Sequence, residues 1–213
     1  MKITTIPVTP FMQNCRILQC AQSGQAAIID PGGDSDKIIR ALTQRGIEPS
    51  VIWLTHGHLD HVGAADTLRK HYQIDIVGPQ RDEQFWFDAL AQQAQMFGFA
   101  PQVPFLPNTW LEHGQTISLG EQQFEVRRCP GHTPGHVIFV CHSHKLAVVG
   151  DVIFKGSIGR TDFPKGDGPT LIASIKREVL SLDDDYRLLS GHGEETSVGQ
   201  ERHKNPFISG KFG

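Results

Sequence analysis

Four side chains that can bind metal ions lie within six consecutive residues. The segment THGHLDH spans residues 55–61 and directly follows an apolar run at residues 51–54. In an extended segment His56 and His58 point the same way, because side chains two residues apart share a face. Asp60 and His61 follow where the chain turns into the next helix, so they can face a second point nearby. The spacing therefore predicts two adjacent metal sites, each of which takes one pair of side chains.

Further metal ligands must come from elsewhere, because four side chains cannot fill two coordination shells. Candidates follow three later apolar strands, and loops at strand ends are where a scaffold commonly presents functional side chains. They are His132 in the loop PGHTPGH at residues 130–136, Asp151 after residues 146–149, and His192 after residues 187–190. Taken alone, each of the three would more often be a turn residue than a ligand. Their shared position after a strand predicts that they are ligands.

Two other polar residues lie beside these segments, and each has two interpretations. Asp30 ends a predicted strand, where it could accept a hydrogen bond from a metal-bound histidine or serve as an ordinary turn residue. His136 shares the loop of His132 and is expected as a structural residue or as a hydrogen-bond partner of the ligands. We therefore expect both residues to lie outside the set of direct ligands.

The ligand types indicate which metals and which reaction to expect. Five imidazoles and two carboxylates without a thiolate favour divalent metals, with Zn²⁺ expected first and Fe²⁺ or Mn²⁺ as alternatives. Two such ions about 3.5–4 Å apart can share one water and lower its pKa toward neutrality, which supplies hydroxide as a nucleophile. A thioester suits this chemistry, because its leaving thiolate has a pKa of about 8–9 and can depart without a general acid. The ligand types therefore predict metal-assisted hydrolysis, a reaction that a thioester would suit.

The elements that must position these residues alternate between strands and helices. Apolar runs and turn residues predict strands at residues 2–8, 15–20, 26–30, 51–54, 74–77, 116–119, 124–129, 137–141, 146–149 and 187–190. Helices are predicted at residues 34–45, 62–71, 81–97 and 171–180. A Pro-bearing connection at residues 101–107 includes Phe105, so we expect a packed loop rather than a linker. The pattern favours an α/β (α+β) fold in which two sheets pack face to face with helices outside.

Composition excludes several classes of protein. The chain has 213 residues, a net charge of −3 and no long Lys/Arg run, so we expect neither nucleic acid nor a membrane as partner. The longest apolar stretch is about five residues, against roughly 20 needed to cross a bilayer. The four cysteines show no CxxC spacing and the N-terminus lacks a signal-peptide core, so we expect reduced thiols and a cytoplasmic protein. No obligate protein partner is indicated.

The order and spacing of the ligands resemble the metallo-β-lactamase superfamily. The residues that carry this resemblance are His56-x-His58-x-Asp60-His61, followed by His132, Asp151 and His192. Within the superfamily the sequence is most similar to type II glyoxalases (hydroxyacylglutathione hydrolases) of the short bacterial YcbL/GloC type, through residues 55–63, 130–136 and 150–164. The resemblance covers nearly the whole chain. It implies a four-layer αββα sandwich with the site at the sheet edges.

The resemblance also implies a role for each ligand. His56, His58 and His132 would hold one metal, Asp60, His61 and His192 the second, and Asp151 would bridge the two. Asp60 and Asp151 would be the catalytic carboxylates beside a bridging hydroxide. The implied substrate is a small-molecule glutathione thioester such as S-D-lactoylglutathione, hydrolysed to D-lactate and glutathione in methylglyoxal detoxification.

Two cations follow Asp151 and could meet the carboxylates of glutathione. Arg160 stands where the longer glyoxalases carry a cation, with Lys155 as a helper, and pairing of Arg160 with Asp162 is the alternative. The longer glyoxalases also have a C-terminal helical domain that binds glutathione. This chain ends six residues after Phe207, so we expect one domain over residues 1–213 without that helical domain.

Aromatic residues and a second reaction class remain open alternatives. Segments 85–87 and 97–99 could line a substrate groove or belong to the core, which is the commoner use of aromatics at helical spacing. Residues 159–163 also resemble persulfide dioxygenases, which use one iron held by the residues corresponding to His56, His132 and Asp151. Residues 191–193 lack the aromatic-bearing segment that those enzymes carry there. A mononuclear-iron dioxygenase acting on glutathione persulfide is therefore the alternative function.

Overall fold

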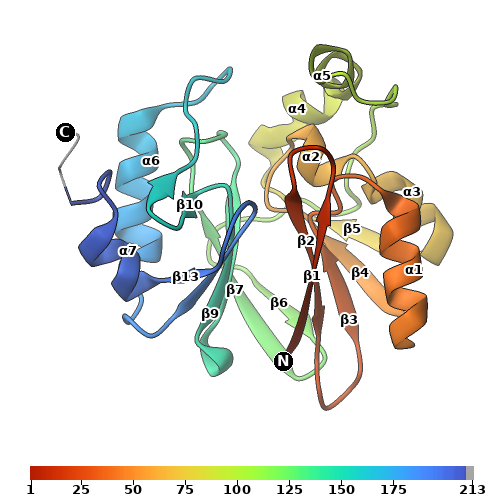
Figure 1. The fold of residues 1–213 in the computed structure, drawn as a ribbon, viewed down its shortest axis with the longest axis horizontal. Helices are drawn as coiled ribbons and strands as arrows, with labels where there is room; N and C mark the ends of the chain where they lie inside the picture. Colours follow the sequence, from red (N-terminus) through yellow and green to blue (C-terminus); the bar gives the residue numbers. More distant parts are fainter. Residues whose placement is uncertain (210–213) are drawn as a thin grey trace.

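Two β-sheets face each other in the middle of the molecule, and helices cover their outer faces (Figure 1). The computed structural model describes residues 1–209. The first sheet has the strand order β1-β2-β3-β4-β5. Its strands are β1 (Lys2–Val8), β2 (Gln13–Gln19), β3 (Ala26–Ile29), β4 (Pro49–Trp53) and β5 (Asp75–Val77). Strands β1 to β3 pair antiparallel, whereas β3, β4 and β5 run parallel.

The second sheet has the strand order β13-β12-β9-β8-β7-β6. Its strands are β6 (Thr116–Leu119), β7 (Gln122–Arg128), β8 (Val137–Cys141), β9 (Leu146–Gly150), β12 (Arg187–Ser190) and β13 (Thr196–Ser197). Only β9 and β12 pair in parallel, and the other neighbours are antiparallel. A short separate hairpin, β10 (Ile153–Phe154) with β11 (Ser157–Ile158), follows β9.

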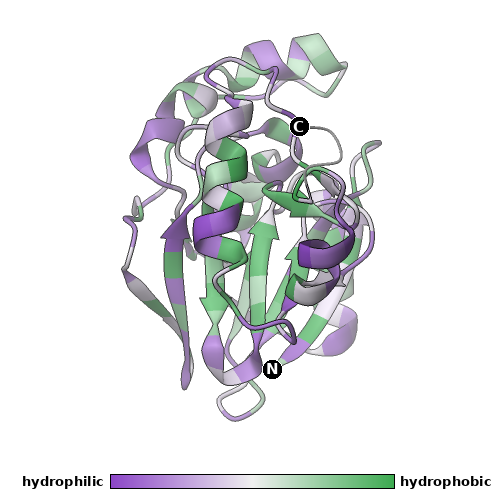
Figure 2. Cartoon of the chain, turned by 90° about the vertical axis from the view of Figure 1, so that its left-hand side faces the viewer, coloured by the Kyte–Doolittle hydropathy of each residue, from purple (hydrophilic) through white to green (hydrophobic). Residues whose placement is uncertain are grey.

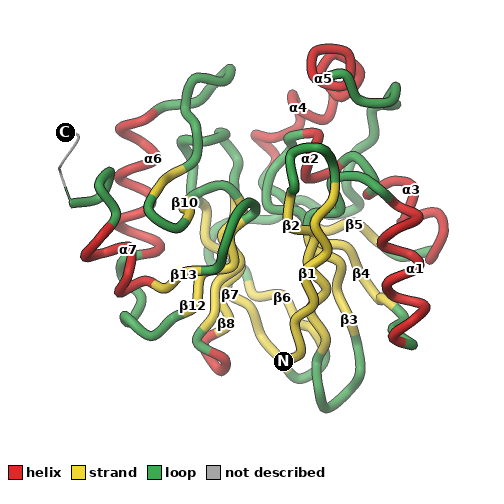
Figure 3. The backbone as a smooth tube through the Cα atoms, viewed as in Figure 1, coloured by secondary structure: helices red, strands yellow, loops and turns green. Residues whose placement is uncertain are grey.

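The helices form the two outer layers, as the tube view also shows (Figure 3). Beside the first sheet lie α1 (Ser35–Arg45), α2 (Leu59–Val62), α3 (Ala65–Tyr72), η1 (Arg81–Glu83), α4 (Gln84–Asp88) and α5 (Leu90–Phe97). Beside the second lie α6 (Gly168–Ser174), the π-helical turn η3 (Ile175–Val179) and α7 (Val198–Lys204), and the short turn η2 (His142–His144) joins β8 to β9. Within residues 1–209 no helix is both long and apolar enough to cross a bilayer. Because helices cover the outer faces of the two packed sheets, the predicted αββα arrangement is confirmed.

Alternating side chains of the central strands build three apolar layers. In β4, Ile52 packs toward α1 and α3, whereas the next residue, Trp53, packs between the sheets. Trp53 contacts Phe124 and Phe139 of the second sheet, with ring centroids 5.0 and 5.4 Å apart. Apolar residues dominate the central strands, while the outer helices mix apolar and hydrophilic faces (Figure 2). Burial on both faces explains why these strands read as continuous apolar runs.

Most predicted elements agree with the structure, and several differ for local reasons. Helix α1 begins at Ser35 rather than at residue 34, and the Asp34 side chain makes no capping hydrogen bond to the helix but accepts one from the Thr9 amide. The single helix predicted at residues 81–97 is broken at Ala89 into η1, α4 and α5. Hairpin β10–β11 and helix α7 were not predicted. The expected packed loop is present, since Phe105 and Trp110 contact the ring of Phe87.

Candidate metal centre

All seven predicted ligands lie at one edge of the two sheets. Strands β4, β7, β9 and β12 all end there, and each is followed by a loop that carries ligands. The first sheet supplies His56 to His61 through the β4–α2 connection. The second sheet supplies the others after β7, β9 and β12, and Ser190 pairs with Gly150 at the ends of two of these strands. That pairing brings Asp151 and His192 out of the sheet side by side.

The first cluster consists of three buried histidines. His58 Nδ1 lies 3.1 Å from His56 Nε2 and 3.0 Å from His132 Nε2. One nitrogen from each ring therefore faces a common point. Since two of these rings come from the β4 end and the third from the β7 end, the cluster joins the two sheets.

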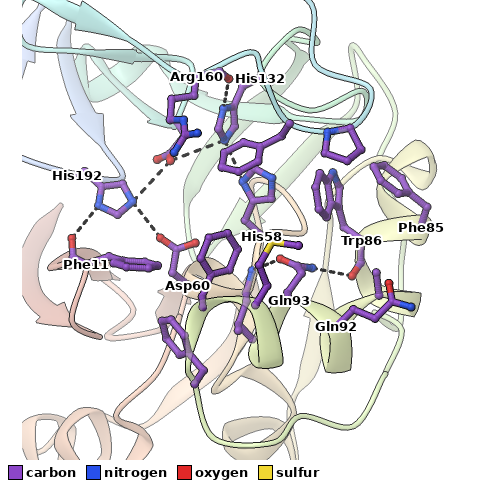
Figure 4. Close-up of a pocket in the computed structure, with 18 of the residues that line it drawn as sticks. Phe11, His58, Asp60, Phe85, Trp86, Gln92, Gln93, His132, Arg160 and His192 are labelled. Atoms are coloured by element: carbon purple, nitrogen blue, oxygen red, sulfur yellow. Dashed lines mark hydrogen bonds and ion pairs between the residues drawn. The ribbon is translucent and has the colours of Figure 1, made fainter.

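The second cluster combines a carboxylate with two imidazoles. Asp60 Oδ2 lies 3.2 Å from His192 Nε2 and 4.0 Å from His61 Nε2. His61 is fully buried, whereas Asp60 and His192 are partly exposed toward a cavity. Figure 4 shows Asp60 and His192 pointing toward each other beside His58 and His132.

Asp151 lies between the two clusters. Its Oδ1 atom is 3.3 Å from His61 Nε2, while Oδ2 is 3.6 Å from His192 Nε2 and 3.8 Å from His132 Nε2. A carboxylate in this position can contribute one oxygen to each cluster. The geometry thus brings together all seven predicted ligands in the predicted groups of three, three and one.

The site has the electrostatic features of a divalent-metal centre. His61 Nε2 and Asp151 Oδ1 are buried and have no hydrogen-bond partner, and such orphaned atoms are costly unless a cation satisfies them. Burial lowers the pKa of His56 and of His58 well below the usual value, which keeps their lone pairs free for a metal. Burial alone would raise the pKa of Asp151, but the neighbouring His61 and His192 hold it far below its usual value. The donor set of nitrogen and oxygen atoms therefore fits divalent metals.

Hydrogen bonds behind the clusters orient the imidazoles. The Nδ1 atoms of His132 and His192 donate to the backbone carbonyls of Arg160 and Phe11 at 2.7 and 3.2 Å, so their Nε2 atoms are left to face the clusters. His56 Nδ1 lies 3.0 Å from the Thr55 hydroxyl. These contacts set the ring orientation independently of any bound ion.

Asp30 and His136 both lie directly behind the ligands. Asp30 Oδ2 is 3.0 Å from His61 Nδ1, and its carboxylate also accepts hydrogen bonds from the amide and the hydroxyl of Thr55. The backbone of Asp30 has a φ of 47°, an unusual value for a residue other than glycine. His136 Nε2 accepts a hydrogen bond from the Asp151 amide at 3.1 Å, and its ring stacks on His56.

A buried carboxylate that the sequence did not indicate connects the two ligand loops. Glu83 accepts hydrogen bonds from the amides of Gly57 at 2.8 Å and Gly135 at 2.7 Å. Burial raises the pKa of Glu83 to about 7. Gln93 adds a second tie by accepting from the Leu59 amide at 2.9 Å. Neither residue stands in a ligand-like pattern, so only the packing of η1 and α5 against these loops reveals their positions.

A cavity of about 550 Å³ opens beside the ligands. Phe85, Trp86, Phe97 and Phe99 line it, whereas Phe87 is fully buried in the core, so the two interpretations of the aromatic segments each hold for part of them. Figure 4 shows Phe85 and Trp86 on the side of the cavity away from His192.

The two predicted substrate-binding cations differ in position. Arg160 lines the cavity, and its guanidinium makes two hydrogen bonds to the Asp162 carboxylate at 2.9 and 2.7 Å. Lys155 does not line the cavity and pairs with Glu194. The alternative pairing of Arg160 with Asp162 is therefore present, but it leaves Arg160 at the cavity edge.

The fold and the ligand set define a class of protein. The sequence model of the metallo-β-lactamase superfamily matches residues 8–192, which include every ligand described above. The chain belongs to the metallo-β-lactamase superfamily and is a hydrolase of that class.

Particular relatives are similar over the whole chain. Hydroxyacylglutathione hydrolase GloC of Haemophilus influenzae is 46% identical over 212 residues, covering 99% of this chain and 100% of the relative. The crystal structure of BLEG-1 B3 metallo-β-lactamase superposes with a TM-score of 0.90 at 34% identity, covering 98% of this chain and 100% of that one. The di-iron-bound form of TTHA1623 superposes with a TM-score of 0.88 at 33% identity, covering 96% of this chain and 99% of the other.

Proposed function

We propose that this chain hydrolyses glutathione thioesters such as S-D-lactoylglutathione to a carboxylic acid and glutathione. The observation that carries the proposal is the position of Asp151 between two clusters whose ligand atoms face a common point. Two of the buried atoms there, His61 Nε2 and Asp151 Oδ1, have no hydrogen-bond partner. The name of the Haemophilus relative, a hydroxyacylglutathione hydrolase at 46% identity, supports the same substrate class.

We assign His56, His58 and His132 to one metal and Asp60, His61 and His192 to a second, with Asp151 shared and Zn²⁺ expected first. Two divalent metals there would supply a Lewis acid for the thioester carbonyl and activate a water. Fe²⁺ or Mn²⁺ suits the same nitrogen and oxygen donors. The di-iron form of one structural relative supports a site for two ions.

The side chains around the clusters have their own tasks. Asp151 stays ionised, since nearby imidazoles hold its pKa low, so its carboxylate can accept a hydrogen bond from the attacking water. Asp60 directs Oδ2 into the same space and can accept the proton that the water loses. The backbone carbonyls of Arg160 and Phe11 and the Asp30 carboxylate keep the imidazoles oriented throughout. Arg160 at the cavity edge is the proposed contact for a glutathione carboxylate, and Lys155 is assigned no contact.

Release of free thiol from S-D-lactoylglutathione by the metal-loaded protein tests the proposal. We expect thiol release in step with metal content, and loss of both after chelation. A control variant, His203→Ala, removes an exposed histidine far from the site and should behave like the wild type. Metal-loaded protein that releases no thiol from any glutathione thioester would reject the proposal.

The alternative function, persulfide dioxygenation with one iron, uses only part of this site. It requires His56, His132 and Asp151. It does not explain why Asp60, His61 and His192 also lie close together. Oxygen uptake with glutathione persulfide, measured on the iron-loaded chain, distinguishes the two reactions. Rapid uptake without thioester hydrolysis would favour the dioxygenase.

A further inference from the structure

The cavity beside the metal centre is built mainly of aromatic and other apolar side chains. We call its apolar wall the aromatic trough, formed by Phe85, Trp86, Met96, Phe97, Phe99 and Phe163. Its residues come from α4, α5 and the loops that follow α5 and β11. Phe11 of the β1–β2 connection closes one end, with its ring 5.9 Å from Phe97 and 5.4 Å from Phe99. Different parts of the chain thus converge on one apolar surface.

The aromatic trough begins at the metal ligands themselves. The ring of Trp86 lies 4.5 Å from that of His58, and the ring of Phe163 lies 4.9 Å from it on another side. Phe163 also lies 6.2 Å from His132. A group attached to a carbonyl at the ligand clusters would therefore enter the aromatic trough directly, without crossing polar surface.

The charge of the cavity wall also argues against a charged acyl group. Among the described residues that line the cavity, Arg160 is the one Lys or Arg, and it is the proposed contact for a glutathione carboxylate, so no second lining cation is left for the acyl end. The Arg160 guanidinium lies over the Phe163 ring at 4.5 Å. Met96 is 76% exposed and Phe97 is 40% exposed, and both line the cavity, so an apolar group there would remove contiguous apolar surface from water. The short, hydroxylated lactoyl group would leave most of this surface uncovered.

We propose that the aromatic trough binds the acyl group of the substrate, so that thioesters with an apolar acyl chain, such as octanoyl, are preferred over the lactoyl thioester. This inference rests on the proposed thioester hydrolysis and names its substrate class. In the reaction the acyl carbon–sulfur bond breaks, the oxygen of water bonds to the acyl carbon, and the thiol takes up one proton while the acid releases the other. The acyl chain gains most from leaving water, since burial of each methylene contributes about fourfold in binding.

A series of acyl-glutathiones tests this assignment on the metal-loaded protein. We expect kcat/KM to rise from acetyl through hexanoyl to octanoyl, with octanoyl exceeding lactoyl by at least about tenfold. A flat series in which lactoyl is turned over as well as octanoyl would overturn the inference and leave the proposed function intact.

Two variants separate the aromatic trough from general surface apolarity. Phe97→Ser should lower the octanoyl-to-lactoyl ratio of kcat/KM by about five- to tenfold, because it removes a ring from the wall. Val103→Ser is the matched control, since Val103 is 80% exposed but does not line the cavity. An equal loss of the ratio in both variants would contradict the assignment.

A binding measurement keeps this inference separable from the hydrolysis. S-octylglutathione and S-methylglutathione are thioethers that cannot be hydrolysed, and calorimetry gives their affinities without any turnover. Tighter binding of the octyl compound, weakened by Phe97→Ser, would support the aromatic trough even if no thioester were hydrolysed. Equal affinities for the two thioethers would overturn it.

Discussion

At the scale of single residues, Asp151 is the side chain on which both clusters depend. Its two oxygens face His61 on one side and His132 and His192 on the other. Removing the Asp151 side chain would leave no carboxylate between His61, His132 and His192, so nothing would connect the two clusters. Its backbone amide, by contrast, is tied to His136 and would be unaffected by a change of side chain.

Asp151→Ala should lower thioester turnover on the order of 10²-fold or more, through lost metal and lost water activation. Asp185→Ala is the control, since Asp185 is an exposed carboxylate paired with Lys145 on the surface. Steady-state kinetics and elemental analysis of both variants check the prediction. Near-normal turnover by Asp151→Ala would be incompatible with a reaction at the shared position.

Arg160→Ala should raise KM for lactoylglutathione by about three- to thirtyfold and leave kcat nearly intact, because the contact would be equal in ground and transition states. Lys145→Ala removes another ion-paired surface cation and serves as the control. Kinetics with glutathione and non-glutathione thioesters measure the effect. Equal loss of turnover for both substrates would show that Arg160 acts through the structure of its loop instead.

Glu83 predicts a pH dependence of stability. Its pKa in the folded protein is about 7, against 4.5 ordinarily, so the native state binds more protons than the unfolded state between these values. Stability from this group is therefore present at low pH and is lost as pH rises from about 4.5 through about 7. Glu83→Gln cannot titrate, so the unfolding free energy of the wild type minus that of the variant should fall across this window.

Urea unfolding of the metal-free proteins at several pH values measures this difference. Glu48→Gln, a neutral substitution of an exposed glutamate, provides the comparison and should show no such trend. A difference between wild type and Glu83→Gln that does not vary with pH would refute the raised pKa of Glu83.

The convergence of the seven candidate ligands could be predicted from the sequence better than the residues that support them. The ligands could be predicted because each follows an apolar strand, and strand ends gather at one sheet edge. The position of Asp30 could be predicted in part for the same reason, because it also follows a strand. Glu83 and Gln93 could not be predicted, because their contacts depend on how η1 and α5 dock against loops that are distant in sequence.

At the scale of elements, helix α2 is positioned by unusually close backbone contact. A Cβ on Gly32 would lie 1.4 Å from the carbonyl oxygen of Asp60, which no side chain can tolerate. The loop after β3 therefore fixes where α2 begins, and α2 carries Asp60 and His61. The sequence predicted a helix from residue 62, but not the short α2 before it, because four residues carry too little periodicity to detect.

Gly32→Ala should displace α2 and destabilise the protein by about 3 kcal/mol or more. Because α2 carries Asp60 and His61, the second cluster should lose its metal first, and the variant should bind about one metal where the wild type is expected to bind two. Gly168→Ala is the control, because a Cβ there makes only an ordinary contact at 3.4 Å. Thermal unfolding and elemental analysis report both effects. Wild-type metal content in Gly32→Ala would contradict the close contact.

At the scale of the whole molecule, the two sheets contribute side chains to the same candidate metal clusters. The strands whose side chains face only the core were predicted closely, since burial on both faces gives a clear apolar run. Hairpin β10–β11 and helix α7 were missed because they are short and amphipathic, and their positions follow from packing on the second sheet. The face-to-face packing of the two sheets could be expected from the strand and helix pattern, whereas the position of the site at the sheet edges was implied by the family resemblance.

Removing the metals should lower stability, because ions that bind only the folded state stabilise it by about 2.7 kcal/mol at a hundredfold excess over Kd. We expect chelated protein to melt several degrees below the loaded form. Hydrogen exchange should accelerate mainly at the ends of β4, β9 and β12, while the central Trp53 layer stays protected. Identical melting temperatures with and without metal would contradict a site shared between the sheets.

Since each cluster takes ligands from both sheets, metal loading also reports on assembly. The half made of β1 to α5 holds His56, His58, Asp60 and His61, and the other half holds His132, Asp151 and His192. Neither half on its own offers either ion a complete set of donors. By the proposed assignment, a newly made chain would acquire tightly held metal only after both halves have folded and docked, and metal-dependent activity would then indicate a correctly assembled molecule.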